Sequence, residues 1–279
     1  VKAYCIFDEG GHVEAVGYHG NERPVALVGL AEKAPNEYVL YKDGAGGHAS
    51  KPGKGTVLGD VARAMAAVEA HPMPYRLTTL VKAHLKALAE SATDKKVAKL
   101  YAHPKKHWDE LVKLAKKDRE LDAKLHTTFA VTMAEASAQA NVLPSHAEAT
   151  MSVRILQGDT VESVKHYLES IMPCDVEVKA TFAEDPKPAG SVESEAYHLM
   201  SETIYDIFGK DTLIVPNLML GASDSRNYSK VSDNVFRFSG RLKTEQWGEA
   251  HHVDERMPIE HLGVPVQFFK AFLKKYREM

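Results

Sequence analysis

The sequence predicts an α/β protein in which an α+β domain is inserted into an α/β domain. The first segment has two apolar strand-like runs and the last segment alternates strands with helices, whereas the middle segment has period-two strands, as in ATMSVRIL at 149–156. Prolines interrupt the pattern at Pro35 and at Asp185-Pro186-Lys187-Pro188. The expected domains are the first part of the α/β domain, the insertion and the last part of the α/β domain: residues 1–36, 37–185 and 186–279.

Two apolar runs predict core strands in the first segment. Val1–Phe7 is rich in strand formers, and we expect a buried strand that stops at the acidic-glycine turn after Phe7. Asp8 therefore lies at a strand end, a common place for a functional carboxylate. Val25–Leu30 predicts a second strand, and Pro35-Asn36 is expected to break the pattern.

The middle segment begins with a strand at Tyr38–Tyr41 that leads into a glycine run ending at His48. Leu58–Ala70 has the pattern of an amphipathic helix. A Lys-rich helical insert is expected at about 73–125, with a break at Pro104. The other expected strands and helix of this segment are Phe129–Glu135, Ala147–Leu156, Val176–Phe182 and, after an Asp159-Thr160 cap, the helix Val161–Ile171.

Strands and helices alternate again in the last segment, as expected where an α/β domain resumes. The expected elements are the helix Glu193–Phe208, the strands Leu213–Leu220 and Val235–Phe238, and a final helix at Ile259–Tyr276.

Composition excludes several classes of protein. The net charge of −3 over 279 residues provides no basic field for nucleic acid, and the Lys-rich segment 95–124 also carries five acidic residues. No run approaches the roughly 18 apolar residues of a membrane span. Cys5 and Cys174 are too few for a disulfide framework, so the expected location is the reducing cytoplasm. The chain opens at Val1 inside an apparent strand, and no targeting segment is visible.

Four ionisable residues stand in or beside turns or glycine runs and are candidates for a functional site. Each also has a simple structural explanation. Asp8 in FDEGG fits an ordinary turn, and His48 in GAGGHASKP fits a loop histidine. Arg226 in GASDSR has the geometry to clamp a carboxylate, but Asp224 there also fits a helix cap. His251 in AHHVDERMP fits a metal site or an exposed histidine pair.

Taken in order, these motifs resemble a known family. FDEGG, AEK, GGHASKP, ANVLP, SVRI, GASDSRNY and HHVDERMP are similar to the carboxypeptidase S, aminoacylase and glutamate carboxypeptidase family of co-catalytic zinc hydrolases, nearest to the carboxypeptidase S branch. The resemblance covers nearly the whole chain. It implies a zinc-peptidase-type α/β catalytic domain with an inserted α+β lid and dimerisation domain, built from an antiparallel sheet plus helices.

The resemblance also implies a two-zinc site, with cobalt or manganese as alternative metals. Asp8 and His251 match positions where the family places metal ligands, one on each ion. Carboxylate and neutral imidazole are both suitable zinc ligands. His252 stands where relatives have glycine, which leaves open which histidine of the pair is the ligand.

Four further positions match substrate-binding groups of the family. The resemblance implies that His48 polarises the scissile carbonyl across a homodimer formed through the lid domain. It implies that Asn141 and Arg154 hold the substrate carboxylate, and that Arg226 is a further substrate-binding group. The implied substrates are peptides or N-acyl amino acids with a free carboxylate, with neither nucleic acid nor membrane as a partner.

The chain lacks several of the family's catalytic motifs. The family's HxD motif, bridging aspartate and adjacent glutamates lie upstream of the FDEGG turn, and no adjacent glutamate pair occurs here. The HxD-like triplets at 107–109 and 252–254 lie elsewhere and fit chance. We therefore expect the C-terminal part of an amidohydrolase or carboxypeptidase, inactive by itself, with an open apolar edge near Val1–Phe7. The alternative is a non-catalytic dimerisation or binding module derived from such an enzyme.

Overall fold

The computed structural model describes residues 2–15, 17–248 and 252–279. The chain divides into two compact units. Unit 1 comprises Val1–Glu32, Leu77–Arg119 and Lys187–Met279, and unit 2 comprises Lys33–Arg76 and Glu120–Pro186. This division differs from the expected one, because most of the Lys-rich helical segment groups with unit 1 and not with the insertion.

Unit 1 is built on a four-stranded mixed sheet with the order β1-β10-β2-β9. Its parallel pairs are β1 with β10 and β2 with β9, and β2 runs antiparallel to β1 and β10. Every residue of β2 is buried, as expected for a central strand. The strands are β1 (Ile6–Glu14), β2 (Val25–Glu32), β9 (Leu213–Met219) and β10 (Val235–Lys243).

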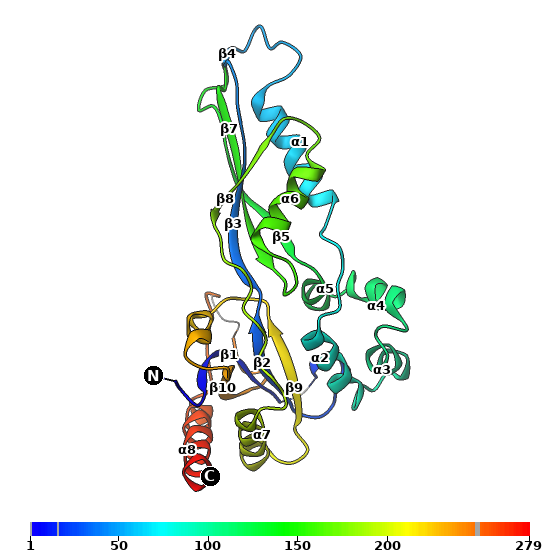
Figure 1. Cartoon of the computed structure of the whole chain (residues 1–279), viewed down its shortest axis with the longest axis vertical. Coiled ribbons are helices and arrows are strands. Elements are labelled where there is room, and N and C mark those ends of the chain that lie inside the picture. The colour runs from blue at the N-terminus through cyan, green and yellow to red at the C-terminus, as the bar shows by residue number, and fades with distance from the viewer. Residues whose placement is uncertain (1, 16, 249–251) are drawn as a thin grey trace. The chain divides into compact units, whose positions relative to one another are not determined.

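Helices α7 (Glu195–Phe208) and α8 (Gly263–Glu278) pack against each other, and α8 also packs on β10 (Figure 1). Phe236 and Phe238 of β10 are completely buried, and Phe238 meets Phe268 of α8 edge to face at 5.2 Å. Helix α2 (Thr79–Ala89) packs on β9, and the Nδ1 of its His84 is 3.1 Å from the Pro216 oxygen. The other helices of unit 1 are α3 (Lys95–Ala102), α4 (Trp108–Ala115) and the 3-10 helices η1 (Tyr18–Gly20), η2 (Asp224–Lys230) and η3 (Ile259–His261).

Unit 2 is an antiparallel sheet with the order β5-β7-β3-β8. Beyond it, the two short strands β4 and β6 pair with each other. The strands are β3 (Ala34–Asp43), β4 (Gly47–His48), β5 (Thr128–Glu135), β6 (Val142–Leu143), β7 (His146–Ile155) and β8 (Glu177–Phe182).

Alternate residues of β3 and β7 form the core of unit 2. Tyr38, Leu40, Met151 and Val153 are fully buried and cluster with residues of α1 (Val57–Ala70) and α6 (Val161–Ile171). This is the period-two pattern expected of strands covered on one face. The Thr160 side chain caps α6 as predicted, because its Oγ1 accepts from the Ser163 N–H at 3.1 Å. The remaining α-helix, α5 (Arg119–Leu125), forms the end of the Lys-rich segment.

Two local expectations are wrong. The first strand begins at Ile6, later than expected, and does not stop before Asp8 but runs through the glycines to Glu14, with register shifts on either side of Gly11. Pro35 and Asn36 do not break the chain either, since both lie within β3. The Asn36 amide exchanges two 2.8 Å hydrogen bonds with the Glu184 main chain, which ties this stretch into unit 2. The mixed α/β class and the other strands and helices are confirmed to within a few residues at most ends. Among the described helices, none has the length and apolar character needed to cross a membrane.

Candidate functional site

A buried ion pair lies at the centre of unit 1. The Nε of Arg237, on β10, donates to the Oε2 of Glu32, the last residue of β2, at 3.2 Å. The two residues are only 4% and 5% exposed. Gly29 makes room for the pair, because a Cβ at that position would lie 2.8 Å from the Arg237 Cβ. A side chain on β2 at this point would therefore displace the arginine.

The same carboxylate oxygen organises the turn after β9. The Ser223 N–H and hydroxyl donate to Glu32 Oε2 at 3.1 and 2.9 Å. Burial lowers the pKa of Arg237, while Glu32 and Asp8 oppose that shift. The pair is therefore stabilised by close geometry and by additional hydrogen bonds, as a buried pair requires.

Asp8 belongs to the same network. Its Oδ2 accepts from the Ser225 N–H at 2.6 Å and its Oδ1 from the Glu9 N–H at 2.8 Å. The hydroxyls of Ser223 and Ser225 are 2.6 Å apart, which connects Asp8 to Glu32. The backbone thus fixes both oxygens of Asp8, and each retains lone pairs for a further ligand.

The described residues do not complete a metal site. Asp8 offers one carboxylate, whereas His251 lies outside the described residues, and His252 is exposed. Within 2–15, 17–248 and 252–279, no three His, Cys, Asp or Glu side chains are grouped so that they could hold an ion. A zinc site needs at least three protein ligands, so this part of the chain does not fit the metal by itself.

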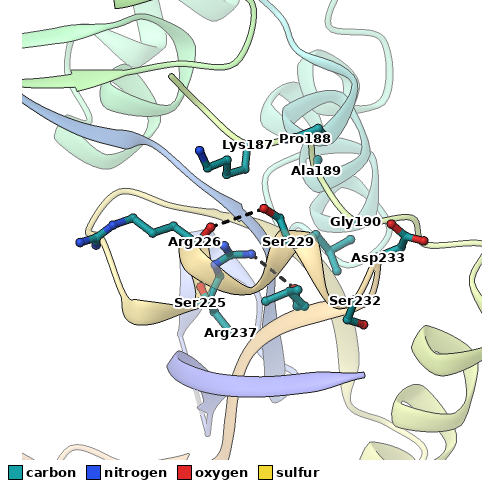
Figure 2. Close-up of a pocket in the computed structure, with 12 residues that line it drawn as sticks. Lys187, Pro188, Ala189, Gly190, Ser225, Arg226, Ser229, Ser232, Asp233 and Arg237 are labelled. Atoms are coloured by element: carbon teal, nitrogen blue, oxygen red, sulfur yellow. Dashed lines mark hydrogen bonds between the residues drawn. The ribbon is translucent and has the colours of Figure 1, made fainter. Parts of the chain in front are cut away.

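Arg226 lines a cavity of about 220 Å³ beside this network (Figure 2). Its Nη1 donates to the Ser223 oxygen at 3.0 Å. In Figure 2 its side chain extends from η2 away from Gly190 and Asp233, on the opposite side of the cavity. The residues that surround the cavity include Leu30, Lys187, Gly190, Ser225, Ser229, Asp233 and Arg237.

In unit 2 the structure brings His48 and Asn141 together. His48 pairs with Val142 in the β4–β6 ladder, and the Ala49 N–H donates to the Asn141 oxygen at 3.0 Å. The exposed His48 ring accepts a backbone N–H from Ser50 on Nδ1 at 3.2 Å, with the Ser50 hydroxyl 2.8 Å away. An Nδ1 that accepts leaves the proton of the neutral ring on Nε2, where it can be donated to a carbonyl.

Arg154 lies in the four-stranded sheet, at the end of β7 that is remote from the start of that strand at His146. It pairs with Pro35, whereas β7 begins at His146, opposite Asp43. Eight residues of strand separate His146 from Arg154, or roughly 26 Å. Within one chain, His48 and Asn141 therefore do not reach a small molecule held by Arg154, and the expected Asn141–Arg154 clamp is not formed by one subunit.

Lys33 is a functional candidate that the sequence analysis missed. It is completely buried, and its ammonium donates to the oxygens of Ala123 and His126 and to the Thr128 hydroxyl at 2.9–3.0 Å. Burial, and then the nearby charge of Arg154, lower the pKa of Lys33 to about 7. Arg154 Nη1 is itself buried and has no hydrogen-bond partner among the described residues.

Glu32, Arg237 and Lys33 share a signal that was available in the sequence. Each is a charge within or directly after an apolar run, in VALVGLAEK or VFRF. Such charges are rarely buried unless they are paired. Ser223 and Ser225 had no comparable signal, because their role depends on how the turn after β9 folds.

Comparison with known proteins identifies part of the chain directly. Residues 36–173 match the M20_dimer family, described as a peptidase dimerisation domain. This confirms the resemblance drawn from the motifs at the level of M20 peptidases.

The matches to curated relatives extend over almost the whole chain. It is 29% identical over 277 residues to the N-fatty-acyl-amino acid synthase/hydrolase PM20D1.1 of Danio rerio, covering 96% of this chain and 53% of that protein. It is 26% identical over 260 residues to the probable carboxypeptidase S-like 2 of Dictyostelium discoideum, covering 92% and 50%. The chain thus spans about half the length of these relatives.

Solved structures show the same fold. The M20 family metallo-carboxypeptidase Sso-CP2 of Sulfolobus solfataricus matches with a TM-score of 0.62 at 16% identity, over 91% of this chain and 60% of that one. The di-peptidase Dug1p of Saccharomyces cerevisiae matches with a TM-score of 0.60 at 14% identity, over 99% and 60%. The α/β fold with an inserted domain is therefore that of M20 peptidases.

Proposed function

Since residues 36–173 are an M20 peptidase dimerisation domain and the fold is that of M20 enzymes, we propose that this chain contributes the lid and part of the catalytic domain of an M20 amidohydrolase or carboxypeptidase. The observation that carries the proposal is the fixed carboxylate of Asp8. By its sequence motif Asp8 matches a position where the family has a metal ligand. The Ser225 N–H of the Glu32–Ser223–Ser225 network holds its Oδ2, and the Glu9 N–H holds its Oδ1.

The proposed substrates are peptides or N-acyl amino acids with a free carboxylate. One relative is named for N-fatty-acyl-amino acids and another for carboxypeptidase activity, and both substrate classes place an amide beside a carboxylate. Arg154 and Arg226 supply the guanidinium groups that bind such an anion best. His48, with its proton on Nε2, would donate to the carbonyl oxygen as negative charge develops there.

Zinc is the proposed cofactor, with cobalt or manganese as alternatives. Asp8 is the ligand that the described residues contribute, and His251 is the second proposed ligand. Because these two do not complete a site, the remaining ligands and the general base have to come from elsewhere, and we expect this chain alone to be inactive.

A homodimer is the proposed state. His48 in the β4–β6 pair and Arg154 near the far end of β7 lie at opposite ends of unit 2, so we propose that both touch one substrate only when they come from different subunits. The edge strand β5, with Met133 56% exposed, offers a surface for such pairing. The cytoplasm is the proposed location, since Cys5 and Cys174 are free thiols.

A second candidate function is a dimerisation or binding module without catalysis. The match of residues 36–173 to a dimerisation domain favours it equally. The two candidates differ in whether the substrate clamp binds a carboxylate.

Calorimetric titration with N-lauroyl-phenylalanine and with its carboxamide separates them. The hydrolase proposal predicts that the free acid binds and that Arg154→Gln weakens binding about tenfold, the loss of one charge-assisted contact. Arg63→Gln, an exposed arginine of the same unit, is the matched control. Equal binding of acid and carboxamide would favour the non-catalytic module. Hydrolysis by the chain alone would contradict the proposal that it lacks the general base.

A further inference from the structure

The surroundings of Lys33 can hold its amino group in either protonation state. The Lys33 Nζ is 3.0 Å from the Ala123 oxygen and 2.9 Å from both the His126 oxygen and the Thr128 Oγ1. The two carbonyl oxygens only accept hydrogen bonds, whereas the hydroxyl can accept or donate one. An ammonium group would donate to all three, and a neutral amine would donate to the two carbonyls and accept from Thr128. No heavy atom has to move when the proton binds or leaves.

The Thr128 hydroxyl lies between Lys33 and Arg154. Thr128 of β5 is directly opposite Arg154 of β7, and the side chains of such a cross-strand pair lie on the same face of the sheet, with Cβ atoms about 5 Å apart. After burial, the charge of Arg154 is the next cause that lowers the pKa of Lys33. The protonated lysine and the arginine therefore repel each other inside unit 2.

Among the described residues, no carboxylate pairs with Lys33 or Arg154. Asp122 and Asp159 are the acidic groups whose charge acts on Lys33. Each of their four oxygens has another partner at 2.5–2.9 Å, and these partners are the Tyr75 hydroxyl, His126 Nε2, Arg76 Nη2 and Thr127 Oγ1. On the helix that carries Asp122, Lys124 pairs with Glu120 at 2.6 Å. The two cations thus lie side by side without an anion of their own.

We infer that Lys33 takes up a proton when a carboxylate binds Arg154, so that Lys33 acts through Arg154 as a positioning residue and couples binding of the substrate anion to protonation. The anion would offset the charge of Arg154, which is the charge that opposes the ammonium form of Lys33. Because Arg154 is a carboxylate ligand only under the proposed function, this coupling rests on that function.

The direction of the pH dependence follows from linkage. If anion binding favours protonated Lys33, then protonated Lys33 favours anion binding by the same factor. The pKa of Lys33 is about 7 in the unbound chain. The affinity for a carboxylate should therefore be highest below pH 7 and should fall as the pH rises above it.

Calorimetric titration of N-lauroyl-phenylalanine at pH 7.5, in phosphate and in Tris, measures proton uptake because the two buffers differ in ionisation enthalpy. We expect an uptake of about half a proton per ligand and a Kd about tenfold higher at pH 9 than at pH 6, an ordinary size for such a coupling. Lys33→Met should abolish the uptake and flatten the pH dependence. Lys179→Met, at an exposed lysine of β8 in the same unit, is the matched control and should retain both.

Lysine-selective carbon NMR of the unaltered chain tests the coupling without any variant, and it decides the question if Lys33→Met does not fold. One Cε signal should titrate near pH 7, whereas ordinary lysines titrate at about 10.4. At pH 7.5 this signal should shift toward the ammonium position when the ligand is added.

Three results would overturn the inference and leave the proposed function standing. They are binding of the acid without proton uptake, uptake that persists in Lys33→Met, and the absence of a lysine signal that titrates near pH 7. Equal affinity for the acid and its carboxamide would instead refute the proposed role of Arg154, and the coupling with it.

Discussion

Replacing Arg237 by Met should destabilise unit 1 more than any change at its surface. The variant leaves Glu32 buried, 5% exposed, and without the guanidinium 3.2 Å from its Oε2. At an effective dielectric constant of about 20, the lost attraction is roughly 5 kcal/mol. Removing one partner of a buried pair generally costs about 3–5 kcal/mol. We therefore expect the free energy of unfolding to fall by about 3–5 kcal/mol.

A double-mutant cycle separates the pair from its surroundings. Glu32→Leu should be destabilising as well, because it leaves Arg237 buried and unpaired and removes the acceptor of Ser223. The double variant Glu32→Leu/Arg237→Met should recover part of the loss, since apolar residues of similar volume replace the buried pair.

Urea unfolding followed by circular dichroism measures each corner of the cycle. Arg63→Met, at an arginine that is largely exposed in its ion pair with Asp60, is the control and should change stability by less than about 1 kcal/mol. A loss below about 1 kcal/mol in Arg237→Met, or strictly additive single changes, would show that the pair is solvated in solution.

Three further predictions concern individual residues. The pKa of Lys33 is about 7 in the folded chain, below its ordinary 10.5, so the unfolded state binds more protons above pH 7. The free energy of unfolding should therefore rise from pH 7 to 9 by up to about 1.4 kcal/mol per pH unit, and Lys33→Met should remove this rise in pH-dependent denaturation. Gly11→Ala should cost about 1–3 kcal/mol in the same assay, because its Cβ would overlap the main-chain oxygens of Leu27 and Arg237. Neutral His48 should be mainly the Nε2–H tautomer in nitrogen NMR spectra, and it should remain so in Ser50→Ala because the Ser50 backbone N–H still donates to Nδ1; a mainly Nδ1–H tautomer would contradict the assigned hydrogen bonds.

Hydrophobic periodicity was sufficient to predict most of the secondary structure. The strands β3 and β7 and the helices α1 and α6 have one buried face, and a one-sided pattern is visible in a sequence. The sequence predicted too early an end for the first strand because glycines normally mark turns. In β1 they instead allow close approach of neighbouring strands, since a side chain at Gly11 would strike β2 and β10.

The division into units could not be predicted from the helical pattern alone. Residues 77–119 lie between two segments of unit 2, and their periodic pattern predicts helices without predicting where they pack. His84 on α2 contacts Pro216 of β9, a residue far along the chain. Such a contact depends on tertiary packing, which the helical pattern does not encode.

Sequence distance is a poor guide to which of the proposed substrate-binding residues lie close together. Asn141 and Arg154 are close in sequence, and their motifs suggested a shared role. An extended strand between them converts that short separation into most of the length of the sheet. His48 and Asn141, far apart in sequence, are joined by the β4–β6 pairing. The motifs therefore group as His48 with Asn141 at one end of the lid and Arg154 at the other, and a shared substrate requires the two ends to come from two subunits.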